Sequence, residues 1–446
     1  MTPDTAPTAP TLWQAFRFWL KLGCISFGGP AGQIAIMHQE LVERRRWISE
    51  RRFLHALNYC MLLPGPEAQQ LATYIGWLLH RTRGGIIAGA LFVLPSLLLL
   101  VLLSWVYMAF GQQPLVAGLF YGIKPAVTAI VLQAAHRIGT RALRNGWLWA
   151  IAGAAFVAIF ALQLPFPLIV AGAALAGYAG GRFLPQAFKT GGHGAAKTSY
   201  GAAVIDDATP PPPHAGFRWS RLALVCGCGA LLWLAPMALL VLTAGWHHTY
   251  TQMAWFFTKA ALLTFGGAYA VLPYVYQGAV VNFGWLTPPQ MMDGLALGET
   301  TPGPLIMVVA FVGFVGGWGQ APFGAAQLPL AGAVAAVLVT WFTFLPSFVF
   351  ILAGGPLVEA TRDDISFTAP LTGITAAVVG VILNLALFFA WHVVWPTGFG
   401  GSPDWAAALI AVGAAVALLR YKQKVPQVIA VCAAVGLLLK LLAPSL

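Results

Sequence analysis

The sequence predicts an all-α polytopic membrane protein built from two inverted repeats. Three observations predict this fold class: an apolar composition, an internal repeat and an uneven distribution of Lys and Arg. Hydrophobic residues make up 59% of the 446 positions and charged residues only 8%, against about a quarter in ordinary soluble domains. So few charged side chains cannot cover a soluble protein of this length with a polar surface. The chain is therefore expected to lie in a lipid bilayer.

The net charge of +11 does not indicate nucleic-acid binding. The Lys and Arg residues lie between apolar segments and do not form one basic patch or helix face. The opening "MTPDTAPTAP" lacks the basic start and cleavage site of a signal peptide. The five cysteines have no metal-ligand spacing and lie mostly in apolar segments. We expect no metal, cofactor or disulfide.

An internal repeat organises the chain. Residues 18–66 align with 256–304 without a gap, and the alignment places "FGG" on "FGG", "PGP" on "PGP" and Lys21 on Lys259. Further along, the "LPS" of 94–96 matches the "LPS" of 345–347. We read the apolar segment after the first "LPS" as a lipid-facing span. The repeat predicts two copies of one folding unit.

The repeat predicts four regions. A flexible linker rich in Gly, Ala and Pro, without packed structure, follows the first copy, and an unduplicated apolar segment long enough to span comes next. The regions are a first membrane repeat over 1–183, a cytoplasmic linker over 184–218, an extra transmembrane helix over 219–245 and a second repeat over 246–446.

Each copy is expected to have two re-entrant helical hairpins followed by about four transmembrane helices. Residues 53–63 form an apolar helix that "PGP" ends, and 11 residues of helix rise only about 16 Å against a core of about 30 Å. The same reasoning applies to 12–27, which "GGP" ends. The predicted spans are 84–108, 114–136, 146–164 and 166–183, with counterparts near 325–353, 367–394, 404–420 and 425–443.

The distribution of Lys and Arg supports inversion of the copies. The loops 43–52, 80–85 and 136–145 are basic, whereas the loops that should lie opposite, including 281–290 and 391–404, contain no Lys or Arg. By the positive-inside rule the basic face, with the linker and the N-terminus, is cytoplasmic. Inverted repeats are a common plan of secondary transporters.

The broken helices predict an anion site. Breaks are tolerated in a membrane only where a polar cavity satisfies the freed backbone groups, and helix starts carry a positive dipole end. One helix start contributes only about 0.3–2 kcal/mol, so several starts and fixed cations must converge. The candidate binding residues are Lys21, Ser26, Phe27, Gly28, Gly29, Pro30, Pro64, Gly65, Pro66, Lys124, Lys259, Thr264, Gly266, Gly267, Thr301, Pro302, Gly303 and Pro304.

Alternatives remain for the charged candidates. Lys21 and Lys259 either help to bind the anion or snorkel to an interface. Lys124 lies inside a span but has Thr375 as its counterpart, which weakens a binding role. Glu67 and Glu299 lie beside the two "PGP" motifs, where acids indicate a proton-coupling or gating role, with helix capping as the alternative.

The motifs resemble those of the chromate ion transporter family in its long, two-repeat form. The resemblance rests on "FGGPAGQIAIMHQELVERRRW" and "LLPGPEAQQLATYIGW" in the first copy, and on "LTFGGAYAVLPYV" and "GETTPGPLIMVV" in the second. It implies a bacterial inner-membrane carrier that exports chromate with the proton-motive force, with sulfate as a structural analogue. The family's FGGP motif is matched by residues 27–30, whereas Ala268 replaces its proline in the second copy.

Two other function classes remain open from the sequence. One is an oxyanion channel that uses the same cavity. The other is a membrane enzyme that acts on a phosphate-bearing lipid, which would need a nucleophile, a metal cluster or a His/acid pair, and His55 is the only histidine near a tip. The expected partners are an oxyanion and the bilayer, and the plan also allows a homodimer.

Overall fold

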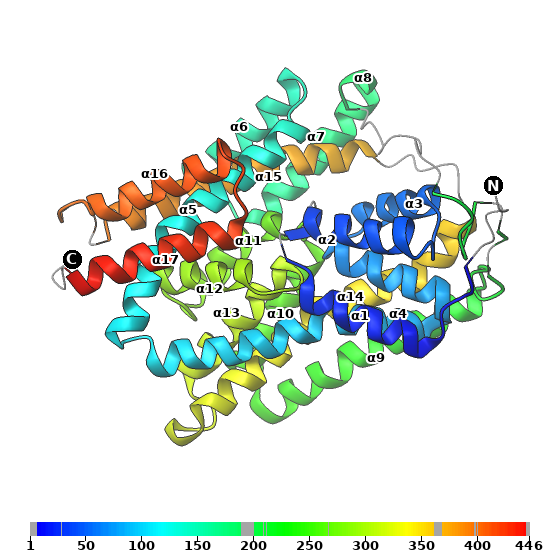
Figure 1. Ribbon diagram of the computed structural model, residues 1–446, viewed down its shortest axis with the longest axis horizontal. Coiled ribbons are helices and arrows are strands. Elements are labelled where there is room, and N and C mark those ends of the chain that lie inside the picture. Colours follow the sequence, from blue (N-terminus) through cyan, green and yellow to red (C-terminus); the bar gives the residue numbers. More distant parts are fainter. Residues whose placement is uncertain are drawn as a thin grey trace.

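The computed structural model describes most of the chain. The described residues are 7–27, 29–188, 200–207, 209–210, 212–265, 267–360, 368–396, 398 and 400–442. Within these residues the regular elements are helices, and no β-strand is present apart from one isolated bridge. Figure 1 shows the helices gathered into one body with the N- and C-termini at opposite ends.

The first copy contributes nine helical elements. They are α1 (Leu12–Ile25), α2 (Gly29–His38), the π-helix η1 (Gln39–Arg44), α3 (Glu50–Leu62), α4 (Glu67–Phe110), α5 (Pro114–Ala142), α6 (Gly146–Phe160), α7 (Phe166–Phe183) and the short α8 (Pro185–Phe188). The unduplicated helix α9 (Trp219–Ala244) follows the linker.

The second copy repeats this order with three differences. Its elements are α10 (Thr249–Leu262), α11 (Ala268–Tyr276), the π-helix η2 (Gln277–Asn282), α12 (Pro288–Thr300), the 3₁₀ turn η3 (Leu305–Met307), α13 (Val308–Gln320), the 3₁₀ turn η4 (Ala325–Gln327), α14 (Leu328–Ala360), α15 (Thr368–Val394), α16 (Trp405–Leu419) and α17 (Val425–Leu442). Helices α13 and α14 stand in place of α4, two 3₁₀ turns are added, and α8 has no counterpart in the described part of the second copy.

The all-α polytopic prediction is confirmed. Seven helices in the described part of the chain are long and apolar enough to cross a membrane. The helices α6 and α16, both predicted as spans, are shorter apolar helices of 15 residues each. The seven long segments are 67–110, 114–142, 166–183, 219–244, 325–359, 369–394 and 425–442.

The two copies agree in local detail. Each has a π-helix at the same repeat position, and after it the Trp47 N–H donates to Leu41 O (2.8 Å) as the Trp285 N–H donates to Ala279 O (2.7 Å). The next helix of each copy begins after a hydroxyl N-cap that accepts from the third helical residue. The sequence repeat is therefore also a repeat of local conformation.

Helix α4 is two helices folded tightly against each other. The backbone leaves the helical region at His80 and Arg81, where φ of Arg81 is 58°. Gly76 then lies so close to Gly84 that a Cβ atom on Gly76 would be 2.5 Å from the Gly84 carbonyl oxygen. Residues 67–79 thus return against 82–110, as a short helix followed by a span predicts.

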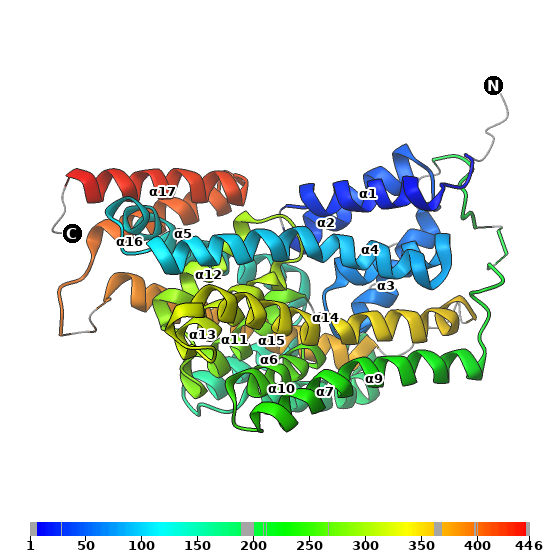
Figure 2. The same cartoon turned by 90° about the horizontal axis from the view of Figure 1, so that it is seen from below.

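The two copies interlock. Helix α15 of the second copy packs on α5, α6 and α7 of the first, α16 and α17 pack on α5, and α14 packs on α4. Figure 2 shows α17 and α16 beside α5 and α14 beside α9. Glycines permit the closest approaches, because a Cβ on Gly122 of α5 would lie 1.9 Å from Cys432 O of α17. The largest hydrophobic cluster therefore contains residues of both copies.

The described part of the linker is packed, which differs from the expected flexible segment. Ile205 pairs with Ile48 in a parallel bridge and is buried among the residues of the first copy. The Ser49 hydroxyl donates to Asp207 Oδ1 at 2.6 Å. Ile205 and the two acids that follow it, Asp206 and Asp207, thus lie against the basic loop 43–52. Residues 189–199 lie outside the described part of the chain.

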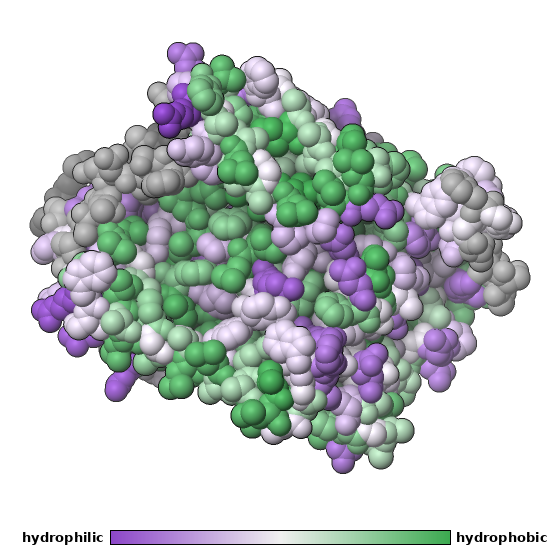
Figure 3. Space-filling view, turned by 180° about the vertical axis from the view of Figure 1, so that it is seen from behind, coloured by the Kyte–Doolittle hydropathy of each residue, from purple (hydrophilic) through white to green (hydrophobic). Residues whose placement is uncertain are grey.

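Apolar side chains cover broad areas of the surface, as Figure 3 shows for one face. Helix α9 is the clearest case, because only Gly229 and Met237 in it are buried. Leu224, Leu231 and Leu242 of α9 are largely exposed. An apolar surface of this extent is what a lipid-facing helix requires.

Candidate functional site

The four helix breaks lie at one place in the structure. A cavity of about 10 Å³ is bordered by the first turns of four helical segments that begin after the Gly/Pro motifs. Its lining residues are Pro30 and Gln33 of α2, Pro66, Glu67 and Ala68 at the start of α4, Ala268 at the start of α11, and Pro304, Leu305 and Ile306 at η3. We call this space the tip cavity. The first N–H groups of a helix have no partner within the helix, so four positive helix ends surround it.

The tips of the two copies exchange hydrogen bonds. The Gly65 N–H of the first "PGP" donates to Thr264 O in the second copy at 2.7 Å. The Gly303 N–H of the second "PGP" donates to Ser26 O in the first copy at 2.9 Å. Each tip is thus held by the other copy through the same pair of positions. The cavity exists only because both copies are present.

The central position of each "PGP" motif requires glycine. The φ angles of Gly65 and Gly303 are 127° and 105°, a region that residues with a side chain rarely adopt. A Cβ on Gly65 would lie 2.3 Å from Ser347 Oγ, and one on Gly303 would lie 2.7 Å from Ser96 Cβ. Each glycine lets a span of the other copy approach the tip.

Ser96 and Ser347 are site residues that the sequence analysis missed. They are the serines of the two "LPS" motifs, they are 0% and 1% exposed, and neither hydroxyl has a hydrogen-bond partner among the described residues. Several buried helical hydroxyls of this chain donate to the carbonyl four residues earlier, as Thr343 does to Val339 O at 2.7 Å, whereas Ser104 and Thr128 share the unpartnered state of the two serines. The repeat of "LPS" was a usable signal, but the apolar residues around it favoured a lipid-facing span.

The predicted hydroxyls Ser26 and Thr264 are at the tips but already donate to their own helices. Ser26 Oγ donates to Leu22 O at 2.6 Å, and Thr264 Oγ1 donates to Ala260 O at 2.7 Å. Thr301 is buried, and its hydroxyl donates to Gly298 O at 3.2 Å. These side chains brace the turns, and their hydrogen atoms do not point to the cavity.

The other motif residues lie around the same breaks. Gly29 and Gly267 have positive φ angles at the starts of α2 and α11. The Phe27 ring is exposed at the surface. Pro64 O accepts from Gln70 Nε2 at 2.8 Å, and Pro302 precedes Gly303 in the second tip. Gly28 and Gly266 lie outside the described residues.

The two symmetry-related lysines are not at the tip cavity. Lys21 is exposed on α1, and Lys259 is partly exposed on α10 with its ammonium 5.7 Å from the ring centroid of Trp255. Trp255 is itself exposed. The structure therefore does not bring either lysine together with the helix starts, and its geometry favours the snorkelling alternative.

Lys124 pairs with a buried acid. Its Nζ lies 3.6 Å from Asp293 Oδ2 of α12, and the Tyr107 hydroxyl donates to the same oxygen at 2.8 Å. Asp293 is 2% exposed. The ion pair explains how a lysine can lie inside a span. Asp293 is aligned with His55 in the repeat, so symmetry gave no signal for this pairing.

The two predicted acids have different environments. Glu67 is the first residue of α4 and lines the tip cavity, where a carboxylate also faces the positive end of its own helix. Glu299 is buried and accepts a hydrogen bond from the Tyr269 hydroxyl. The Cζ atom of Arg137 lies 5.9 Å from the centroid of the Tyr269 ring. Only Glu67 lines the tip cavity.

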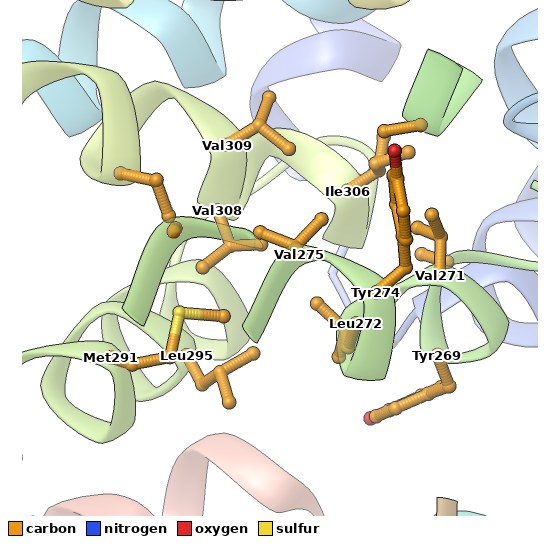
Figure 4. Packing of buried hydrophobic residues seen from close by; sticks show 14 of the residues in the cluster. Tyr269, Val271, Leu272, Tyr274, Val275, Met291, Leu295, Ile306, Val308 and Val309 are labelled. Carbon is orange, nitrogen blue, oxygen red and sulfur yellow. The ribbon is translucent and has the colours of Figure 1, made fainter. Parts of the chain in front are cut away.

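The two halves around the cavity differ in polarity. In the first copy Gln33 Nε2 donates to Gly303 O, and the buried Gln69, Gln70 and Thr73 follow along α4. The second copy has Val271, Met307, Val308 and Phe311 at the corresponding positions. Figure 4 shows Ile306, Val308 and Val309 packed with Val275 in this apolar region of the second copy.

A buried ion pair joins the polar half to the second copy. Arg52 Nη1 of α3 lies 2.8 Å from Glu359 Oε2 of α14, and the Tyr74 hydroxyl donates to Glu359 Oε1 at 2.6 Å. The sequence analysis read Arg52 only as part of the basic loop. Nothing in a single sequence pairs it with an acid 307 positions away.

A larger cavity of about 450 Å³ lies elsewhere, between the linker and the end of the first half of α4. Leu78, Ile205 and Pro213 are among its largely apolar lining residues, and His214 is the only titratable one. Burial lowers the pKa of His214, and the nearby Arg81 and Arg221 add to this effect. The described residues contain no group of three or more His, Cys, Asp or Glu that could hold a metal ion.

Comparison with known proteins gives one consistent result. The family model "Chromate transporter" matches residues 13–178 and 251–437. The "Chromate transport protein" of Pseudomonas aeruginosa is 34% identical, over 85% of this chain and 82% of that protein. The protein of the same name from Cupriavidus metallidurans is 29% identical, over 97% of this chain and 94% of that protein. No solved structure gives a significant match.

A shorter relative supports the duplication. The "Uncharacterized transporter YwrA" of Bacillus subtilis is 29% identical over 30% of this chain, but the alignment covers 77% of that protein. Its length therefore corresponds to roughly one of the two copies. One copy of the unit exists as a separate chain in that organism.

Proposed function

Because the chain belongs to the chromate transporter family, we propose that it is an inner-membrane secondary carrier that exports chromate, or a similar oxyanion such as sulfate, from the cytoplasm. The family and the relatives are transport proteins, so the chain is a transporter and not an enzyme. The single observation that supports the site is the meeting of four helix starts at the tip cavity. Helix starts are ready anion sites.

The tip cavity is the proposed binding site of the oxyanion. Its volume of about 10 Å³ is of the order of one water molecule. A tetrahedral oxyanion is larger, so the helix starts must separate when it binds. The hydrogen bonds of Gly65 and Gly303 across the copies are the contacts that this separation would change.

The proposed orientation places the basic loops, the linker and the N-terminus in the cytoplasm. The two copies then lie inverted, and each pair of helices that meets at a tip re-enters on one side of the membrane. The support is the Lys and Arg asymmetry of the loops. An impermeant thiol reagent tests this orientation at an Asn282→Cys substitution, which should be labelled from outside intact cells. Labelling only after permeabilisation would overturn the inverted arrangement.

Glu67 is the proposed proton-coupling group, and Glu299 with Tyr269 is a second candidate farther from the cavity. A Glu67 carboxylate in the cavity repels an incoming anion, so protonation of Glu67 and anion binding favour each other. The proton then travels with the anion, and export is driven by the membrane potential, which acts on the remaining net negative charge. A direct contact between the anion and Lys21 or Lys259 is not part of this proposal, because both side chains lie at the surface here.

Uptake of radiolabelled chromate into everted membrane vesicles tests the function. A carrier accumulates chromate against its gradient, and the accumulation changes when the proton gradient is collapsed. The second candidate, an oxyanion channel, would instead give conductance that does not depend on a counter-ion. A chain that moves neither chromate nor sulfate would overturn the proposal.

A further inference from the structure

Arg52 carries donors that the fold leaves unused. Its side chain is 6% exposed, and its Nη1 atom is bonded to Glu359. Its Nε and Nη2 atoms are buried and have no hydrogen-bond partner among the described residues. Buried polar groups in proteins are almost always hydrogen-bonded, and charged donors most of all. The Nε and Nη2 donors of Arg52 are therefore available to a ligand.

The free edge has the shape of an oxyanion site. The Nε–H and Nη2–H groups of a guanidinium point in parallel and match two oxygen atoms of one anion. The edge is also fixed in direction, because Glu359 holds Nη1 and the Tyr74 hydroxyl holds the other oxygen of Glu359. A side chain oriented in this way loses little freedom when a ligand binds.

The local charge favours an anion at this edge. Arg52 lies in the first turn of α3, where the positive helix end disfavours a cation. Glu50, the acid of the same turn, is already paired with His38. Arg81 and Arg221 lie within electrostatic reach of His214, as does Glu359. The charged groups around His214 therefore comprise two cations and one acid, and that acid is Glu359, the partner of Arg52.

A polar track leads from Arg52 to the tip cavity. Tyr74, Thr73, Gln70 and Gln69 follow one another along α4 toward Glu67, and all four are buried. Leu62 follows Arg52 by ten positions along α3, which corresponds to about 15 Å of helix. The second copy has only apolar residues at the positions of this track.

We propose that the Nε–Nη2 edge of Arg52 is a second binding site for a tetrahedral oxyanion, which the anion occupies between the cytoplasm and the tip cavity. The proposal rests on the proposed function, because it takes the cargo to be an oxyanion. Arg52 holds two oxygen atoms, and Glu359 acts as a positioning residue for the guanidinium. The site is specific to the polar half, so it serves one side of the membrane.

Sided transport kinetics test the proposal. Chromate is supplied either from the cytoplasmic side, in everted vesicles, or from the opposite side, in right-side-out vesicles. Arg52→Lys keeps the charge next to Glu359 but loses the two parallel donors. We expect the KM for cytoplasmic chromate to rise about tenfold or more, as the loss of hydrogen bonds to a charged ligand predicts. The KM from the other side and both maximal rates should stay within about twofold of the wild type.

Two further variants complete the test. Arg51→Lys, a matched change of the exposed neighbour, should leave both KM values unchanged. Arg52→Gln combined with Glu359→Gln removes both buried charges together and covers the case that Arg52→Lys fails to fold, and it should raise the same cytoplasmic KM.

The outcomes separate the two proposals. A wild-type cytoplasmic KM in a folded Arg52→Lys or double variant would overturn the Arg52 site and leave the carrier intact. Equal KM increases from both sides would also overturn it, because they would place the effect at the tip cavity. No chromate or sulfate flux in the wild type would overturn the proposed function, and the Arg52 site with it.

Discussion

The two copies make the same backbone hydrogen bonds at the tip cavity, but the side chains around it are polar in the first copy and apolar in the second. The Gly65 and Gly303 N–H groups donate to equivalent carbonyls of the other copy. Gln70 and Thr73 of the first copy correspond to Val308 and Phe311 of the second. The proposed anion site therefore uses the symmetric part, the backbone and the paired serines. The proposed route to it uses the asymmetric part.

This division has a physical reason. A site that must be reached from two sides needs the same donors in both states, and backbone N–H groups at helix starts supply them without a change of side chain. In the proposed mechanism the polar residues of the first copy line the route of the anion, whereas Figure 4 shows apolar side chains packed together in the second copy. The first copy therefore carries the cytoplasmic route in the proposed orientation.

The largest expected effect comes from the tip glycines, because both copies depend on them equally. Gly65→Ala and Gly303→Ala each impose strain of about 1–3 kcal/mol at a positive φ angle and push a Cβ into a serine of the other copy. We expect each change alone to abolish chromate transport. Gly153→Ala, which meets no atom within 4 Å, is the control and should transport normally. A Gly303→Ala variant that transports chromate would contradict the equal requirement for the two tips.

Glu67 should give the next largest effect, and it belongs to the first copy only. Its carboxylate is negative at high pH and repels the anion, so the KM for chromate should rise with pH by about tenfold or more. Glu67→Gln should remove this pH dependence while transport at low pH remains. Glu43→Gln, at an exposed acid, should keep the wild-type pH profile. A pH profile unchanged in Glu67→Gln would exclude Glu67 as the coupling group.

The serine pair tests whether the two copies contribute equally. Ser96→Ala and Ser347→Ala each remove an unused buried hydroxyl next to a tip, and each should weaken chromate binding about tenfold. Thr343→Ala removes a hydroxyl that already donates within its own helix and should leave binding unchanged. Binding to purified protein in lipid nanodiscs measures all three. An effect of Ser96→Ala without one of Ser347→Ala would make the site one-sided.

The two lysines should give the smallest effect. Pairing in the repeat predicts that they bind the anion, but Lys21 is exposed and Lys259 lies over the exposed Trp255. We expect transport by the combined Lys21→Gln and Lys259→Gln variant to stay within about twofold of the wild type, because a snorkelling lysine contributes little beyond its stem. Abolished transport at equal membrane abundance would restore the lysines to the site.

The sequence allowed the local structure to be predicted well. Pro and Gly end helices for reasons that lie within a few residues, so "FGG" and "PGP" mark the breaks and the copies confirm each other. The partners across the copies could not be predicted. Ser96 and Gly303, or Arg52 and Glu359, meet only because the two copies interlock. The packing of the linker on the basic loop was missed because it joins residues about 157 positions apart within the first copy and the linker, for which local composition gives no signal.

The position of a bound oxyanion shows directly whether the tip cavity is the binding site. Selenate is a tetrahedral oxyanion whose selenium atom scatters anomalously, so crystals of the protein grown with selenate would locate it. We expect an anomalous peak at the tip cavity, between Pro66 and Pro304, within hydrogen-bonding reach of the helix starts of both copies. Selenate bound elsewhere, with no peak between these two prolines, would contradict this expectation.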